Sequence, residues 1–242
     1  MLMRIEAAFG RQQMTIELQK RFIADASHEL KTPLTALKTR IALAKNFETS
    51  EPVRRQLDSM DEISDRMKGL ILGLLSLARA EEGKLRLNSE PILMSDLMKR
   101  SKEIVNPVSG VELQLEVHDD CLLIVDVALL VQAISNLIQN SLRHTEPGKS
   151  VWAKASTNEH GVLIEVIDEG SGIPAEDLPN IFERFYRSDL HRSRDAGGVG
   201  LGLAIVKAII EAHQGSIEVS SELGVGTAMR VSLPPTVIAD VT

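Results

Sequence analysis

The hydrophobic pattern of this 242-residue chain changes its period partway along, and this change constrains the fold more than any other feature. Between residues 30 and 78, apolar side chains recur at alternating spacings of three and four, as in packed helices. From residue 111 onward, several segments instead alternate apolar and polar residues, which is typical of half-buried strands. We therefore predict a helical domain followed by a domain that combines helices with a sheet.

The first part is predicted to be a helical hairpin. The seam of its first helix consists of Leu30, Leu34, Leu37, Ile41 and Ala44. Residues 46–52 predict a connection, because Pro52 suits the first turn of a new helix. The second helix carries Val53, Leu57, Met60, Ser64, Met67, Ile71, Leu74 and Ala78, with a parallel stripe at Ile63, Leu70 and Leu77. This face is too wide for one partner helix, so we predict a homodimeric four-helix bundle through residues 1–82; the alternative is a monomeric hairpin packed on the rest of the chain.

The second part predicts an α+β layer in which helices cover one face of a mixed sheet. Strand patterns occur at residues 111–117, 121–125, 151–156, 162–168, 216–220 and 227–233. Helical patterns occur at residues 95–105, 127–143 and 201–212. The boundary between the two parts is expected within residues 83–90, just before Pro91.

The composition limits the kinds of binding partner and the cellular compartment that are expected. A net charge of −7 argues against nucleic acid as the main partner, because phosphate backbones are bound by clustered Lys and Arg. Cys121 is the single cysteine, which excludes an intrachain disulfide and favours a reducing compartment. No apolar run approaches the roughly 20 residues that cross a bilayer. The first residues resemble a helix already under way, so we expect a fragment of a longer protein.

His28 is the candidate nucleophile. It lies just off the heptad seam, so its imidazole is predicted to face solvent, and Glu29 beside it can take the ring proton and free a nitrogen to attack phosphorus. Thr32 follows one turn later on the same helix face, and Pro33 should bend the helix there. A lone surface histidine is usually inert, and the nucleotide site predicted below is what favours a catalytic role.

Asn136 and Asn140 share one face of the helix predicted over residues 127–143, and Arg143 and His144 follow one turn later. Asn carries a propensity cost inside a helix, so a pair of them favours a function. An amide oxygen can bind Mg²⁺ without adding charge, which leaves the phosphates of a nucleotide to complete the octahedron. Taken alone, the stretch is equally compatible with solvated polar residues.

Two glycine-containing segments complete the pattern. Asp168 ends a predicted strand before Gly170, Gly172 and Ile173, where a carboxylate can accept a hydrogen bond from an adenine amino group; alone, this segment could be a simple turn. Residues 197–202 are rich in glycine and precede a predicted helix, whose free N–H groups favour a triphosphate. The long polar stretch between them, residues 184–197, is predicted to be a lid.

Together these segments closely resemble the sensor histidine kinases of two-component signalling, over about residues 15–235 and in the family's order. The five family motifs correspond to an H box at His28, an N box at residues 136–144, a first G box at 168–172, an F box at 182–185 and a second G box at 198–202. Each motif alone is moderately specific, whereas five in sequence are highly specific.

The resemblance implies four regions: the end of a signal-relay linker helix at residues 1–14, a dimerisation and histidine-phosphotransfer hairpin at 15–84, a Bergerat-type ATP-binding domain at 91–235 and a tail at 236–242. It implies catalytic roles for His28, Glu29 and Thr32 and a Mg²⁺ ligand at Asn140. The nucleotide site that it implies comprises Asn136, Asn140, Arg143, His144, Asp168, Gly170, Gly172, Ile173, Tyr186, Arg187, Gly198, Gly200, Leu201, Gly202 and Thr227. Many members have Lys where Arg143 stands and Tyr where His144 stands.

The implied activity is ATP-dependent autophosphorylation of His28, followed by transfer to an Asp of a response regulator, with phosphatase activity toward that regulator. ATP and Mg²⁺ are the implied cofactors. The parent protein is expected to be anchored in a membrane upstream of residue 1, with this portion soluble on the cytoplasmic side. Nucleic acid is not an expected partner.

Two other functions fit parts of the pattern. An ATPase of the wider Bergerat group is disfavoured, because such enzymes activate water with a Glu where Asn136 stands, and an amide cannot act as a general base. A nucleotide-binding scaffold or degenerate kinase would bind ATP without labelling His28. Detection of acid-labile, base-stable phosphate separates both from a kinase.

Overall fold

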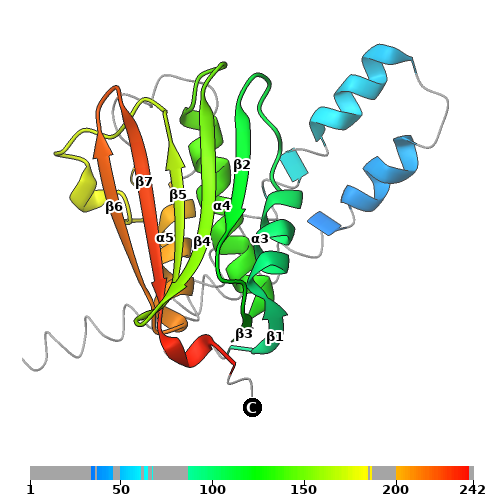
Figure 1. Ribbon diagram of the computed structural model, residues 1–242. Coiled ribbons are helices and arrows are strands. Elements are labelled where there is room, and N and C mark those ends of the chain that lie inside the picture. Colours follow the sequence, from blue (N-terminus) through cyan, green and yellow to red (C-terminus); the bar gives the residue numbers. More distant parts are fainter. Residues whose placement is uncertain are drawn as a thin grey trace, which may run out of the picture. The chain divides into compact units, whose positions relative to one another are not determined.

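The computed structural model describes residues 34–35, 37–45, 50–60, 63–64, 67, 87–184, 186 and 200–239 (Figure 1). The chain divides into two compact units, Met1–Lys84 and Leu85–Thr242.

The first unit contains helical stretches at residues 37–45 and 51–60. Pro52 lies in the first turn of the second stretch, as predicted. A salt bridge of 3.0 Å between Lys45 Nζ and Asp58 Oδ1 joins the two stretches. On the first predicted seam, Leu34 and Ile41 are buried, whereas Leu37 is 46% exposed.

Much of the second seam is open to solvent within the single chain. Among the described residues of this unit, the large apolar side chains that are exposed are Leu37, Leu43, Val53, Met60, Ile63 and Met67. Single exposed apolar residues are ordinary, but a series of them along predicted helix seams is typical of a surface that packs against another helix. The seam residues Leu30, Ile71, Leu74 and Ala78 lie outside the described residues.

The second unit is an α+β sandwich. Its strands are β1 (Glu90–Leu93), β2 (Glu112–Val117), β3 (Leu122–Val125), β4 (Ser150–Asn158), β5 (Gly161–Asp168), β6 (Ser216–Glu222) and β7 (Gly226–Leu233). Its helices are α3 (Met94–Glu103), α4 (Val127–His144) and α5 (Gly202–Ala212), with 3₁₀ turns η1 (Leu178–Asn180) and η3 (Pro235–Val237). All six predicted strands and all three predicted helices of this part are present, with ends that coincide or differ by one or two residues.

The main sheet has the order β2-β4-β5-β7-β6. The β2–β4 pair is parallel and the other three pairs are antiparallel, so the sheet is mixed, as predicted. β1 and β3 form a separate antiparallel ladder. The sequence analysis did not predict β1, which contains Pro91, a residue that cannot donate a ladder hydrogen bond; β1 is an edge strand of this ladder, where proline is tolerated.

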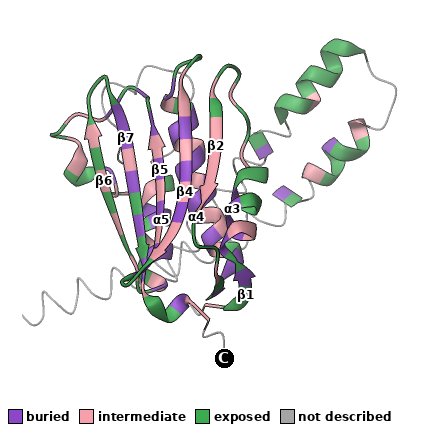
Figure 2. Ribbon diagram, in the orientation of Figure 1, coloured by how far each residue is buried: buried purple, intermediate pink, exposed green. Residues whose placement is uncertain are grey.

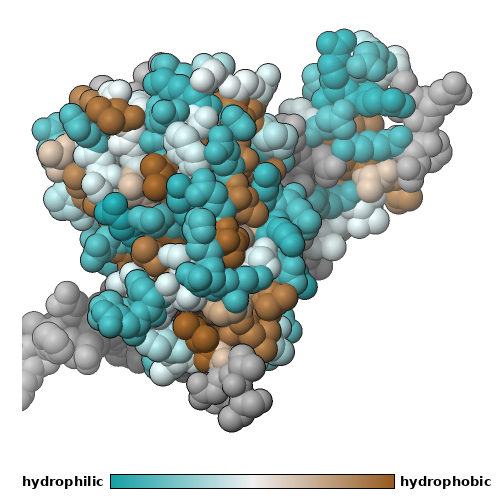
Figure 3. All heavy atoms as spheres, viewed as in Figure 1, coloured by the Kyte–Doolittle hydropathy of each residue, from teal (hydrophilic) through white to brown (hydrophobic). Residues whose placement is uncertain are grey.

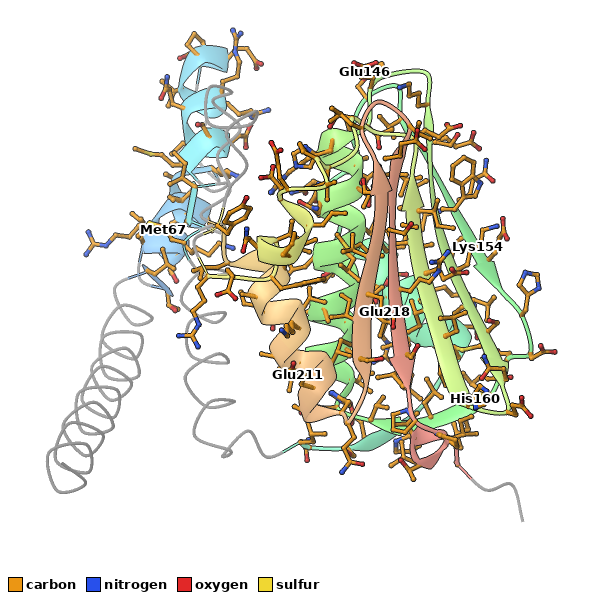
Figure 4. The ribbon with its side chains drawn as sticks, turned by 90° about the vertical axis from the view of Figure 1, so that its left-hand side faces the viewer. Met67, Glu146, Lys154, His160, Glu211 and Glu218 are labelled. Carbon is orange, nitrogen blue, oxygen red and sulfur yellow. The ribbon has the colours of Figure 1, made fainter. Side chains whose placement is uncertain are left out.

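The core lies between one face of the sheet and helices α3, α4 and α5 (Figure 2). Along β5, every second residue from Val162 is buried, and the same alternation runs along β7. The partner surface is α4, whose side chains at Leu130, Ile134, Leu137 and Ile138 are at most 1% exposed. In Figure 4, α4 and α5 stand on one side of the sheet, and Lys154 projects from the other.

The outer face of the sheet carries polar cross-strand pairs. Lys154 Nζ lies 2.9 Å from Glu116 Oε2, and Arg230 Nε lies 2.8 Å from Glu165 Oε1. Figure 3 shows hydrophilic residues over much of this face, with hydrophobic ones between them. None of the described helices is both long and apolar enough to cross a membrane.

Candidate functional site

Asp168 is the centre of the candidate site. It occupies the last inward-facing position of β5, in the register of Val162, Ile164 and Val166, and is 7% exposed. Its Oδ1 accepts hydrogen bonds from the backbone N–H of Gly170 at 2.9 Å and of Thr227 at 3.2 Å. The fold therefore places a carboxylate where the alternation would otherwise place an apolar core residue.

Burial raises the pKa of the Asp168 carboxyl above its usual range. Hydrogen bonds from the Ser141 side chain and from the N–H groups of Gly170 and Thr227 oppose this rise in pKa, because they stabilise the ionised form. A buried carboxylate that costs desolvation is a reasonable marker of a binding site. Sequence reasoning missed Ser141, which nothing in its local pattern distinguishes from an ordinary helix residue.

Thr227 is the direct cross-strand partner of Asp168 in the β5–β7 ladder. Its side chain lies on the same inward face and is 9% exposed. Thr227 Oγ1 lies 2.9 Å from Ser221 Oγ, which also receives the backbone N–H of Ile173 at 2.8 Å. Two predicted residues, Thr227 and Ile173, are thus joined through Ser221, a residue that the sequence did not indicate.

The turn after β5 is held between the end of α4 and the β6–β7 hairpin. The backbone N–H of Ser171 donates to the carbonyl of His144 at 3.1 Å, and the carbonyl of Ser171 accepts from Gly224 N–H at 2.8 Å. Gly172 has φ +70°, and a Cβ there would collide with the carbonyl of Glu222. A Cβ on Gly170 would meet the carbonyl of His144. Glycine is therefore required at both predicted positions by close backbone approach.

Helix α4 brings the predicted amide pair to the same end of the unit. Asn136, Asn140 and His144 are half-buried and Arg143 is exposed, near the helix C-terminus that contacts the turn at Ser171. Among the described residues no cluster of His, Cys, Asp and Glu could hold a metal ion. The amide oxygens of α4 suit Mg²⁺, which commonly takes few protein ligands and keeps phosphate and water oxygens for the rest.

The N-terminus of α5 is the candidate phosphate-binding element. Gly200 has φ +75°, and Gly202 is the first helical residue. Among the described residues no side chain caps this helix end, and the first N–H groups of a helix can bind an anion. Leu201 is 1% exposed, so its side chain belongs to the core and its backbone alone could face a nucleotide. Gly198 lies outside the described residues.

The remaining predicted residues are only partly described. The hydroxyl of Tyr186 donates to Asp177 Oδ1 at 2.6 Å, which ties the F-box segment to the turn preceding η1. Arg187 lies outside the described residues, as do His28, Glu29 and Thr32. The roles predicted for these four remain predictions.

Comparison with known proteins agrees with this geometry. The family model described as histidine kinase-, DNA gyrase B- and HSP90-like ATPase matches residues 125–237, and the His Kinase A (phospho-acceptor) domain matches residues 18–83. The probable sensor histidine kinase TcrY of Mycobacterium tuberculosis is 39% identical over 238 residues, which cover 97% of this chain and 50% of TcrY.

Two solved structures are also similar. The mycobacterial sensor histidine kinase MprB has a TM-score of 0.54 and 32% identity, with 60% of this chain and 97% of MprB covered. Full-length ShkA in complex with AMPPNP has a TM-score of 0.72 and 28% identity, with 90% of this chain and 46% of ShkA covered. The chain belongs to the sensor histidine kinases of two-component systems, with a histidine-kinase helical region followed by the ATPase-type sandwich. It spans about half the length of the curated relatives it matches.

Proposed function

We propose that this chain binds ATP in its second unit and transfers the γ-phosphoryl group to His28 in its first. The observation that carries the proposal is the Asp168–Thr227 pair, two polar side chains buried side by side at the end of β5 and the start of β7. Adenine offers an amino group whose N–H donors can bind to such acceptors, and a carboxylate whose burial costs desolvation is a feature that a ligand-binding role would explain.

The phosphates are proposed to lie between α4 and the start of α5. Asn136, Arg143 and His144 would approach them from α4, with the N–H groups at Gly200 and Gly202 from the other side. Gly170, Gly172 and Ile173 would border the base, and Tyr186, Arg187 and Gly198 would belong to the segment that covers the nucleotide. Asn140 would hold Mg²⁺, which neutralises charge on the phosphate oxygens when bound.

Phosphoryl transfer needs little covalent chemistry from a protein beyond positioning and charge stabilisation. In the proposed reaction, a ring nitrogen of His28 forms the bond to the γ-phosphorus as the bond to the β,γ-bridging oxygen breaks, and ADP leaves. Glu29 accepts the proton of the imidazole. Thr32 is proposed to orient water in the reverse task, the removal of phosphate from the regulator.

The proposed partners are a second copy of the chain and a response regulator. The exposed apolar side chains of the first unit, among them Val53, Met60 and Ile63, support association through the helices. Phosphohistidine would pass its phosphoryl group to an Asp of the regulator. A parent protein that is anchored in a membrane upstream of residue 1, with this portion on the cytoplasmic side, is part of the same proposal.

The test is incubation with γ-labelled ATP and Mg²⁺, followed by acid and base treatment of the labelled protein. The chain should acquire acid-labile, base-stable label, and His28→Gln should abolish it. His118→Gln is the matched control, because that imidazole is 68% exposed on the second unit and should leave labelling unchanged. Labelling that survives in His28→Gln would exclude this residue as the acceptor. Rapid ATP hydrolysis without phosphoprotein would instead favour an ATPase.

A further inference from the structure

Ser221 stands at a junction of three segments beside the proposed adenine site. It lies near the end of β6, directly opposite Thr227 in the β6–β7 ladder. Its Oγ donates to the carbonyl of Gly226 at 2.8 Å, accepts the backbone N–H of Ile173 at 2.8 Å and lies 2.9 Å from Thr227 Oγ1. One hydroxyl therefore connects the turn after β5, β6 and the start of β7.

The direction of the hydrogen bond between the two hydroxyls follows from these contacts. A serine hydroxyl has one proton and two lone pairs. The carbonyl of Gly226 can only accept, so it takes the proton of Ser221. The N–H of Ile173 can only donate, so it donates to one lone pair of Ser221 Oγ. The contact with Thr227 Oγ1 then uses the second lone pair of Ser221 Oγ. Thr227 is therefore the donor to Ser221, and its own proton is committed.

Thr227 then presents only lone pairs to the space that it shares with Asp168. The two side chains are cross-strand partners on the inward face of the sheet, where directly opposed side chains lie close together. Asp168 Oδ1 already accepts two backbone N–H groups, as a carboxylate oxygen does. Both side chains that would face the base are thus acceptors, a combination that favours a ligand presenting donors.

We propose that Ser221 is a positioning residue for nucleotide selectivity: it fixes Thr227 as an acceptor facing position 6 of a bound purine, so that the site binds a 6-amino group more tightly than a 6-oxo group. The inference rests on the proposed function, because it assumes that the base lies against Asp168 and Thr227. Without the hydroxyl of Ser221, the proton of Thr227 is released and can turn to donate to a 6-oxo group. Ser221 itself need not touch the nucleotide.

The experiment compares ADP with inosine diphosphate, which carries a 6-oxo group in place of the 6-amino group and a proton on N1. Dissociation constants are measured by calorimetry for the full chain and for Ser221→Ala, Ser221→Thr and Ser220→Ala. In Ser221→Ala the preference for ADP should fall about fivefold, the size expected for one neutral hydrogen bond. Ser221→Thr keeps a hydroxyl and should restore the preference, and Ser220→Ala, an exposed neighbour on β6, should leave it unchanged.

The outcomes distinguish failure of the selectivity role of Ser221 from failure of the proposed function. If both nucleotides weaken equally in Ser221→Ala, the residue is merely structural and the selectivity role is wrong. A preference that stays at its original value refutes the role as well. If the unmodified chain binds neither nucleotide, the proposed function itself fails. A reduced preference restored by Ser221→Thr supports the inference.

Discussion

The Nε2 atom of His213 accepts a hydrogen bond from the backbone N–H of Asp126 at 3.1 Å, joining the C-terminal end of α5 to the N-cap of α4. The other ring nitrogen, Nδ1, lies 2.8 Å from the carbonyl of Ile209. The carbonyl can only accept, so Nδ1 carries the proton and Nε2 is the acceptor, which makes the imidazole neutral. His213 is 4% exposed, and burial lowers its pKa despite the raising effects of Ile209 and Asp126.

We predict that His213 makes folding sensitive to mild acid. Its folded pKa lies below the unfolded value of about 6.5, so the unfolded chain binds more protons as pH falls. The contribution of the neutral His213 imidazole to the free energy of unfolding is fully present above the unfolded pKa and is lost as pH falls from there toward the folded pKa. Between pH about 7.5 and 5.5 the loss should be at most about 1.4 kcal/mol.

The measurement is urea unfolding of the chain and of His213→Gln at both pH values. The stability of the unmodified chain relative to His213→Gln should fall on acidification, since Gln can form the same two contacts but does not titrate. Subtracting the free energy of unfolding of His213→Gln from that of the unmodified chain removes the contribution of other titrating groups that are distant from His213. His160→Gln is the matched control: this imidazole is 84% exposed at the β4–β5 turn, at the far end of the sheet from Glu146 (Figure 4). A constant difference would contradict the assignment.

The sequence predicted those site residues whose position follows from the period of a single strand or helix. Alternation along residues 162–168 puts Asp168 on the inward face, and the helical period puts Asn136 and Asn140 on one face. It did not predict the role of Ser221, because that depends on the register between β6 and β7. Strand register is a long-range property, and nothing in the residues around Ser221 indicates its partner.

The contribution of Asp168 to nucleotide binding can be measured separately from its effect on the stability of the fold. We predict that Asp168→Asn weakens ADP binding by about tenfold to a hundredfold, as expected for loss of a charge-assisted hydrogen bond. The amide oxygen can still accept the N–H groups of Gly170 and Thr227, so the fold should persist. Calorimetric titration with ADP gives the first quantity, and thermal unfolding gives the second.

The pH dependence of this variant has the opposite sign from that of His213. The folded pKa of Asp168 is raised, so its stabilising contribution is fully present below the unfolded pKa and is lost as pH rises through the folded pKa. Relative to the unmodified chain, Asp168→Asn should therefore gain stability between acid and neutral pH. A variant whose relative stability fell over the same range would contradict burial as the dominant cause.

The amide of Asn140 should matter for the metal rather than for the base. We predict that Mg²⁺ tightens ADP binding to the unmodified chain and that Asn140→Ala loses about tenfold of this gain, in the range reported for metal-site residues. In the presence of a chelator, the affinity of Asn140→Ala for ADP should differ little from that of the unmodified chain. Gln139→Ala is the control on the same helix, because its side chain instead accepts the N–H of Asn106 at 2.9 Å. Equal losses with and without Mg²⁺ would contradict a metal ligand at Asn140.

Substituting two glycines that share a positive φ distinguishes the cost of backbone strain from the cost of a steric clash. Gly172 has φ +70° and faces the carbonyl of Glu222, whereas Gly224 has φ +82° and a Cβ there would meet nothing within 4 Å. Gly224→Ala should cost about 1 kcal/mol, the usual penalty for a side chain in the left-handed region. Gly172→Ala should cost about 2 kcal/mol or more, because the turn must also move away from β6. Urea unfolding midpoints at constant m-value measure both, and equal costs would show that the contact with Glu222 relaxes freely.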